Sequence, residues 1–446
     1  MDRISRVLEV SDLPLVSSAD ERAAITLLDD ETLIQRTILP GGVRVLSQHV
    51  PAQRSVSLSA WCPVGSRDEQ PAQAGSTHFL EHLLFKGTPT RSAQDIANAF
   101  DEVGGESNAA TTKEYTYYWA RTLAEDLPMS VTVLMDMMSS SLLDEAEFER
   151  ERGVILDELA MGNDDPVEIV HENFAQAIYG DHPLGRPIGG SIETVSAAQR
   201  DAVVGYYHEK YRPSSLVIVA AGAVDHAELC ELVDGALAGA GWDLDPAVVP
   251  VSTRIGNQPA PVFDGREVQK EKPGEQAHVL LGGRSITAND DRRPAMAVLL
   301  SILGGSMSSR LFQEIRERRG LAYTTYAFDT AYVDYGHFGM YAGCAPKNVD
   351  LVEQLMREQL VDLATAGPTD AELARVKGQL RGAMALGLED SGARMARLGR
   401  AEVVHGRFIP LELTLSRINA ITSGDVADLA QFLLDQPACR SVVMPI

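Results

Sequence analysis

The chain has 446 residues, of which 45% are hydrophobic and 23% charged, so its composition excludes disordered, collagen-like and coiled-coil proteins. A net charge of −24 argues against nucleic acids and anionic membranes as partners. No apolar run approaches the roughly 20 residues of a membrane span, and the acidic N-terminus lacks the apolar core of a signal peptide. The four cysteines are widely spaced without a C-x-x-C motif, which favours reduced thiols and a cytoplasmic location.

Regular patterns begin after an acidic extension at residues 1–31. The periodicities predict strands at 44–46, 56–61, 115–120 and 215–221, and helices at 76–85, 93–103 and 126–139. A longer helix begins at Asp144, where Glu147 completes a capping-box-like start, and should end near Gly162. These alternating elements predict an α+β fold.

The chain divides into two similar halves around a linker at residues 246–275, which is rich in Pro, Gly and charge. DEAEFERERGVILDELAMG in the first half aligns with TDAELARVKGQLRGAMALG in the second, so that Glu147 matches Glu372 at an offset of 225 (372 minus 147). We therefore expect two homologous domains, 32–245 and 276–446, each a mostly antiparallel sheet with helices packed on one face.

The most informative local pattern is H-x-x-E-H, from His78 to His82. Residues four apart share a helix face, so His78 and His82 can present two imidazoles to one ion. Catalytic zinc combines three protein ligands with an open position. Glu81 shares this face, and its carboxylate can reach a water at the open position without binding the metal. The order of the motif is typical of the inverzincin peptidases.

A third ligand must come from elsewhere, and the helix that begins at Asp144 offers two candidates. Glu151 and Glu158 are seven residues apart and therefore on one face, so spacing alone leaves the choice open. In the second half of the chain, Glu151 and Glu158 align with Val376 and Ala383. The second half therefore keeps the helix but lacks both carboxylates. The loss in one copy favours a chemical role in the other.

From about residue 34 to 446 the chain resembles the pitrilysin/insulinase zinc peptidases, particularly the two-domain branch with the mitochondrial processing peptidase β subunit and its bacterial relatives. The matching segments include LPGGVRVL, GSRDE, HFLEHLLFKGT, GGESNAATTKEYTYY, ERGVILDELAM and LGGSMSSRLFQEIRERRGLAYTTYA. The resemblance implies that His78, His82 and Glu158 bind one Zn²⁺ per chain. It implies that Glu81 is the general base and that Glu151 orients one of the ligating histidines.

The same resemblance implies two substrate-binding segments. Asn108 and Ala109 correspond to an edge strand that pairs with extended peptide, and Arg316 and Tyr323 to a pair that holds the substrate backbone and stabilises the oxyanion. Larger relatives fuse four such domains into a clamshell, so we expect this chain to form a homodimer. In that arrangement Arg316 and Tyr323 act in trans on the zinc of the partner.

Two functional classes fit these observations, and one of them allows a second form of assembly. The favoured one is a zinc endopeptidase that cleaves peptides or unfolded segments in an enclosed chamber. The alternative is a non-catalytic structural or interaction subunit, like the respiratory-complex core proteins of this superfamily, whose zinc motifs are usually degraded. An obligate heterodimer with an inactive partner keeps the enzyme class and changes only the assembly. The complete motif favours the peptidase.

Overall fold

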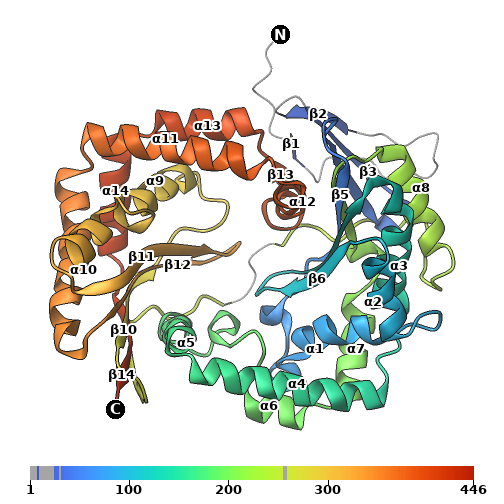
Figure 1. Ribbon diagram of the computed structural model, residues 1–446, viewed down its shortest axis with the longest axis horizontal. Coiled ribbons are helices and arrows are strands. Elements are labelled where there is room, and N and C mark those ends of the chain that lie inside the picture. The colour runs from blue at the N-terminus through green and yellow to red at the C-terminus, as the bar shows by residue number, and fades with distance from the viewer. Residues whose placement is uncertain (1–7, 10–24, 30–31, 255–258) are drawn as a thin grey trace. The chain divides into compact units, whose positions relative to one another are not determined.

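The computed structural model describes residues 8–9, 25–29, 32–254 and 259–446, which form two compact units (Figure 1). The first unit comprises residues up to Leu159, Pro187–Arg254 and Leu386–Glu412. The second comprises Ala160–Arg186, Ile255–Ala385 and Leu413–Ile446. Most of the extension at 1–31 and residues 255–258 of the expected linker lie outside the described residues.

The first unit is built on a seven-stranded sheet in the order β2–β3–β4–β8–β5–β7–β6. Its strands are β2 (Ile25–Asp29), β3 (Thr32–Ile38), β4 (Arg44–His49), β5 (Ser55–Cys62), β6 (Glu106–Thr111), β7 (Thr116–Leu123) and β8 (Val217–Gly222). Among the described strands of this sheet, only β4 and β8 are parallel neighbours. The short pair β1 (Leu8–Glu9) and β13 (Arg407–Phe408) is separate.

Most helices of this unit pack on one face of the sheet, as the sequence predicts, whereas α12 (Ser391–Arg400) covers the other face (Figure 1). The main layer contains α1 (Ser76–Leu83), α2 (Ala93–Asp101), α3 (Leu127–Ser140), the first part of α4 (Glu145–Asp164), α6 (Ile192–Ala197), α7 (Arg200–Lys210) and α8 (His226–Leu237). Alternation along β5 explains the two faces, because Leu58 and Ala60 join the core under α1 and α3. Trp61 points the other way and packs on Gly399 of α12 (Ser391–Arg400).

The second unit repeats this architecture on a five-stranded sheet, ordered β11–β12–β10–β14–β9. Its elements are β9 (Glu267–Lys272), β10 (Ala277–Arg284), β11 (Ala322–Ala331), β12 (Gly336–Cys344), β14 (Cys439–Pro445), α9 (Arg293–Gly304), α10 (Val349–Ala366), most of α11 (Asp370–Gly387), most of α13 (Leu411–Ala420) and α14 (Ser423–Leu434). The order matches β6–β7–β5–β8–β4, including a parallel pair, β9 with β14. The α+β class and the internal repeat are thus confirmed.

The units exchange one helix relative to the expected continuous ranges. Helix α5 (Pro166–Tyr179) comes from the first half of the chain and belongs to the second unit, whereas α12 comes from the second half and belongs to the first. The two helices begin 225 positions apart, at Pro166 and Ser391. Their apolar faces decide the exchange: Val170 and Phe174 of α5 are buried in one cluster with Leu280 of β10. The expected linker also differs, since residues 267–272 form β9.

Candidate metal centre

Helix α1, which carries the H-x-x-E-H motif, is fixed at its N-terminus by a buried carboxylate. Glu69 accepts hydrogen bonds from the backbone N–H groups of Gly75 (2.9 Å) and Thr77 (2.7 Å), and from the Thr77 hydroxyl (2.7 Å). A carboxylate in this position satisfies free helix N–H groups and opposes the positive end of the helix dipole. The GSRDE segment thus positions the motif, a role that the sequence analysis did not assign to Glu69.

Packing determines which side of α1 faces the site. Phe79 and Leu80 are fully buried in the core of the first unit, and this anchors the helix. His78, Glu81 and His82 remain partly accessible on the other side. The sequence prediction of a motif-bearing helix is confirmed, and its three polar side chains are presented together.

The ligand atoms of His78, His82 and Glu158 form a compact triangle. The Nε2 atoms of the two histidines are 3.3 Å apart, and Glu158 Oε2 lies 3.5 Å from His82 Nε2 and 3.7 Å from His78 Nε2. Around a tetrahedral ion with bonds of about 2.0–2.1 Å, neighbouring ligand atoms are about 3.3–3.4 Å apart. The three residues therefore fit one zinc ion, and among the described residues they alone form such a metal-binding group.

The structure also separates the two glutamates that the sequence left as alternatives. Glu151 and Glu158 lie two turns apart on α4, both facing α1. Glu158 faces the two Nε2 atoms and keeps 47% of its side chain exposed, so it borders the open side of the site. Glu151 is 2% exposed and lies 3.0 Å from the other nitrogen, Nδ1, of His82. Its position fits an orienting carboxylate rather than a ligand.

A lysine completes this contact. Lys86 Nζ lies 2.7 Å from Glu151 Oε1, at the end of the helical turn Leu84–Lys86 that follows α1. Lys86 lies outside the H-x-x-E-H motif and was not among the predicted site residues. Its spacing of four residues from His82 places both side chains on the same helical face, and this signal could have found it.

The second histidine has a different environment. His78 Nδ1 is buried and makes no hydrogen bond with any described residue, and a Cβ atom at Gly189 would lie 3.4 Å from it. Burial, followed by the charge of His82, lowers the pKa of His78, although Glu81 and Glu158 oppose this shift. The lowered pKa favours the neutral imidazole, which is the form that binds metal.

Glu81 differs from the other carboxylates of the site. Its side chain makes no hydrogen bond or ion pair with any described residue, although its charge acts on the neighbouring His78. A carboxylate on the motif face that is not engaged by the protein is available to accept a proton. An unengaged carboxylate beside the metal ligands is what a general base requires.

The strand that contains Asn108 and Ala109 is an edge of the sheet. It is β6, which pairs only with β7 among the described strands, with Asn108 opposite Trp119 and Ala109 opposite Tyr118. Its free edge offers backbone groups to an extended peptide. The position of these residues fits substrate binding by strand addition.

Arg316 and Tyr323 lie in the second unit and contact each other. The Arg316 guanidinium lies 4.3 Å from the Tyr323 ring centroid and 4.6 Å from that of Phe312, and its Nη1 donates a hydrogen bond of 3.1 Å to Tyr323 O. Tyr323 itself is 73% exposed. Arg316 and Tyr323 thus form one cluster, in which the guanidinium contacts two rings and the phenol of Tyr323 is exposed.

Comparison with known proteins shows which family this chain belongs to. Residues 44–191 match the family model described as insulinase (peptidase family M16), and residues 197–380 match the model described as peptidase M16 inactive domain. An "uncharacterized zinc protease" of Streptomyces coelicolor is 46% identical over 413 residues, which cover 93% of this chain and 90% of the relative. The chain belongs to the insulinase family of peptidases.

Other insulinase-family relatives agree with this assignment. Proteins of the same description from Mycobacterium tuberculosis and Bacillus subtilis are 42% and 35% identical, and the alignments cover 97% and 93% of this chain and 96% and 98% of those chains. Solved structures share the fold: a protease from Helicobacter pylori has a TM-score of 0.83 at 22% identity, over 92% of this chain and 99% of that one. A peptidase M16 inactive domain from Pseudomonas fluorescens has a TM-score of 0.82 at 19% identity, over 93% and 98%.

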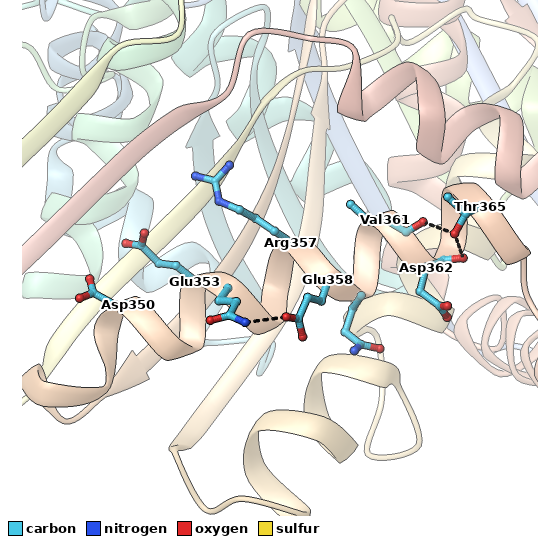
Figure 2. Close-up of a pocket in the computed structure, with 9 residues that line it drawn as sticks. Asp350, Glu353, Arg357, Glu358, Val361, Asp362 and Thr365 are labelled. Carbon is cyan, nitrogen blue, oxygen red and sulfur yellow. Dashed lines mark hydrogen bonds between the residues drawn. The ribbon is translucent and has the colours of Figure 1, made fainter.

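This insulinase-family chain also has a surface depression of about 750 Å³ along α10, away from the motif residues in sequence (Figure 2). Its lining, from Asp350 to Thr365, comes from that one helix and includes several carboxylates. Two of them already have partners, because Glu353 pairs with Arg440 at 2.7 Å and Asp362 with Arg310 at 2.6 Å. The depression is therefore a solvated helix face. No described helix is long and apolar enough to cross a membrane.

Proposed function

We propose that this chain is a zinc-dependent endopeptidase that hydrolyses peptides or unfolded polypeptide segments. The observation that carries the proposal is the triangle of His78, His82 and Glu158, whose spacing of 3.3 to 3.7 Å fits tetrahedral zinc. When bound, zinc lowers the pKa of a water and polarises the scissile carbonyl.

Proton transfer, orientation of the metal ligands and alignment of the peptide are carried out by residues of the chain. Glu81, which no described residue engages, accepts the proton of the attacking water at a carboxylate oxygen and later passes it to the leaving amine. Glu151 accepts the Nδ1 hydrogen bond of His82 and fixes the orientation of that ring. The free edge of β6 aligns the peptide through Asn108 and Ala109, so that the scissile bond lies beside α1.

We place Arg316 and Tyr323 at the carbonyl oxygen of the substrate. A guanidinium and a phenol are suitable donors for the negative charge that develops there. Because the larger relatives combine four such domains, we propose a homodimer in which these two residues serve the zinc of the partner, with the chamber enclosed by both chains. The four free cysteines are all buried, which supports the proposed cytoplasmic location.

The proposal is tested by zinc content and peptide cleavage in the wild type and Glu81→Gln. Both should hold about one zinc per chain, and only the wild type should cleave a mixed peptide library. Glu149→Gln, an exposed carboxylate of α4, is the matched control and should retain activity. Zinc binding without any cleavage by the wild type would favour the non-catalytic subunit, whereas an active zinc-loaded Glu81→Gln would remove Glu81 from the mechanism.

A further inference from the structure

Three side chains form a continuous contact behind the metal site. Lys86 Nζ is 2.7 Å from Glu151 Oε1, and Glu151 Oε2 is 3.0 Å from His82 Nδ1. Each carboxylate oxygen thus has its own partner. Lys86 makes no other ion pair or hydrogen bond with the described residues, so its charge is directed to Glu151 alone.

Burial makes this arrangement different from a surface ion pair. The Glu151 side chain is 3% exposed, whereas that of Lys86 is 31% exposed. A buried carboxylate with too few partners is costly, because water cannot replace the missing interaction. Loss of the ammonium would leave Oε1 without its partner, and the carboxylate would then turn toward any remaining donor. The imidazole ring of His82, which is hydrogen-bonded to this carboxylate through Nδ1, would then change its orientation as well.

The contact also joins the two helical segments that supply the metal ligands. His82 and Lys86 belong to α1 and the turn that follows it, whereas Glu151 and Glu158 belong to α4. The ion pair between Lys86 and Glu151 therefore holds α4 against α1 on the side opposite the Nε2 atoms. A shift of α4 would move Glu158 as well as Glu151, since both lie on the same helix.

We propose that Lys86 is a positioning residue of the metal centre, which orients His82 and the ligand helix α4 through the carboxylate of Glu151. This inference deepens the proposed function and rests on the zinc site described above. Lys86 has no contact with the ligand atoms themselves, so its effect on the metal passes through Glu151.

The test is a double-mutant cycle read out as zinc affinity. The dissociation constant for zinc is measured by competition with a chelating dye for the wild type, Lys86→Met, Glu151→Gln and the double variant. Loss of an outer partner of a metal ligand typically weakens metal binding 10- to 100-fold. We expect Lys86→Met to weaken zinc binding about tenfold in the wild-type background, and less than twofold when Glu151 is already Gln. Lys86→Arg should restore affinity to within about threefold, since it keeps the charge.

Controls separate this effect from folding and from the proposed function. Arg150→Met removes an exposed ion pair with Glu147 on α4, the helix that carries Glu151, and should leave zinc affinity unchanged. Melting of the zinc-free proteins shows whether Lys86→Met is folded. Equal weakening in both backgrounds, or no weakening by Lys86→Met, would overturn the proposal. Absence of zinc binding by the wild type would instead overturn the proposed function.

Discussion

The side chain of Asn108 accepts, at Oδ1, a hydrogen bond of 2.8 Å from the backbone N–H of Ala109. Both residues lie on β6, the edge strand next to β7. A side chain that engages a backbone donor of an edge strand protects that strand from unwanted pairing with another chain. A peptide that adds to β6 through this donor must therefore displace the Asn108 side chain.

Replacement of Ala109 by proline tests whether this N–H binds substrate. Proline has no N–H, yet edge strands accept it where the ladder does not need the donor. One hydrogen bond contributes about 0.5–1.5 kcal/mol, so we expect kcat/KM for peptides to fall about two- to tenfold, mainly through KM. Zinc content should stay at that of the wild type.

The control for this prediction is Ala109→Ser, which keeps the N–H and should retain wild-type kinetics. Steady-state cleavage of a fluorogenic peptide measures both variants, and circular dichroism confirms their folding. A folded Ala109→Pro protein with unchanged KM would place the substrate elsewhere.

Arg316 is expected to contribute to turnover rather than to zinc binding. Its guanidinium is held between the rings of Phe312 and Tyr323, a geometry that the ammonium of lysine does not reproduce. Loss of one oxyanion donor typically costs 10²- to 10³-fold in kcat, so Arg316→Lys should lower kcat about 100-fold with zinc content unchanged. Arg318→Lys, which alters an exposed partner of Glu314, is the control and should be neutral. Normal kcat in Arg316→Lys would exclude this role.

Subunit mixing tests whether Arg316 acts in trans. Glu81→Gln and Arg316→Ala chains are each expected to be inactive as homodimers. After subunit exchange, a mixed dimer would combine one intact Glu81 with one intact Arg316 across the interface, so activity should return. Equal mixing makes half of the dimers mixed, and each mixed dimer has one restored site of two. The recovered activity should therefore be at most about a quarter of the wild-type value. Native mass spectrometry measures the mixed species. Mixed dimers without activity would contradict the trans arrangement.

Zinc should stabilise the first unit, because the three proposed ligands, His78, His82 and Glu158, come together only in the folded chain. A ligand at 100 times its dissociation constant adds about 2.7 kcal/mol to the free energy of unfolding. Zinc should therefore raise the melting temperature of the wild type, and a chelator should reverse the rise. His82→Ala, which lacks one ligand, should show little change. An equal rise in His82→Ala would locate the stabilising zinc outside this site.

Much of the site is predictable from the sequence because it depends on local helix geometry. His78, Glu81 and His82 share a helix face through their spacing, and Glu151 and Glu158 share another through an interval of two turns. The choice between the two glutamates is not local, since it depends on how far along α4 each lies relative to α1. In the sequence, only the family resemblance selects Glu158 as the third ligand. In the structure, the distances from Glu158 Oε2 to the two histidines support this selection.

The exchange of α5 and α12 shows what periodicity does not reveal. An amphipathic helix indicates that it has an apolar face, but not which sheet will cover that face. Val170 and Phe174 are buried in one cluster with Leu280, more than 100 residues away in the chain, and no local pattern encodes that pairing. Glu69 was missed for a similar reason, because it lies in the loop before α1 and no regular spacing connects it to Gly75 and Thr77.

The ion pair between Arg310 and Glu372 should make the stability of the second unit depend on pH. Burial acts to raise the pKa of Glu372, but Arg310 and the N–H and hydroxyl of Thr369 outweigh it and lower the pKa to about 2. Arg310 Nε and Nη2 lie 2.8 and 3.0 Å from the two carboxylate oxygens. Because the folded-state pKa is below the unfolded value near 4.5, the stabilisation is present above that value and is lost as the pH falls toward 2.

Glu372→Gln should therefore destabilise the protein by about 1–2 kcal/mol at pH 7, the range for a hydrogen-bonded charge that is partly screened by solvent. The difference from the wild type should shrink between about pH 5 and pH 2, since protonation progressively removes the same charge from the wild type. Urea unfolding at pH 7, 5, 4 and 3 measures the difference. The control Glu358→Gln, at an exposed position of α10, should show none of this trend. A difference that stays constant with pH would mean that Glu372 stabilises the unit through hydrogen-bond geometry and packing, and not through its charge.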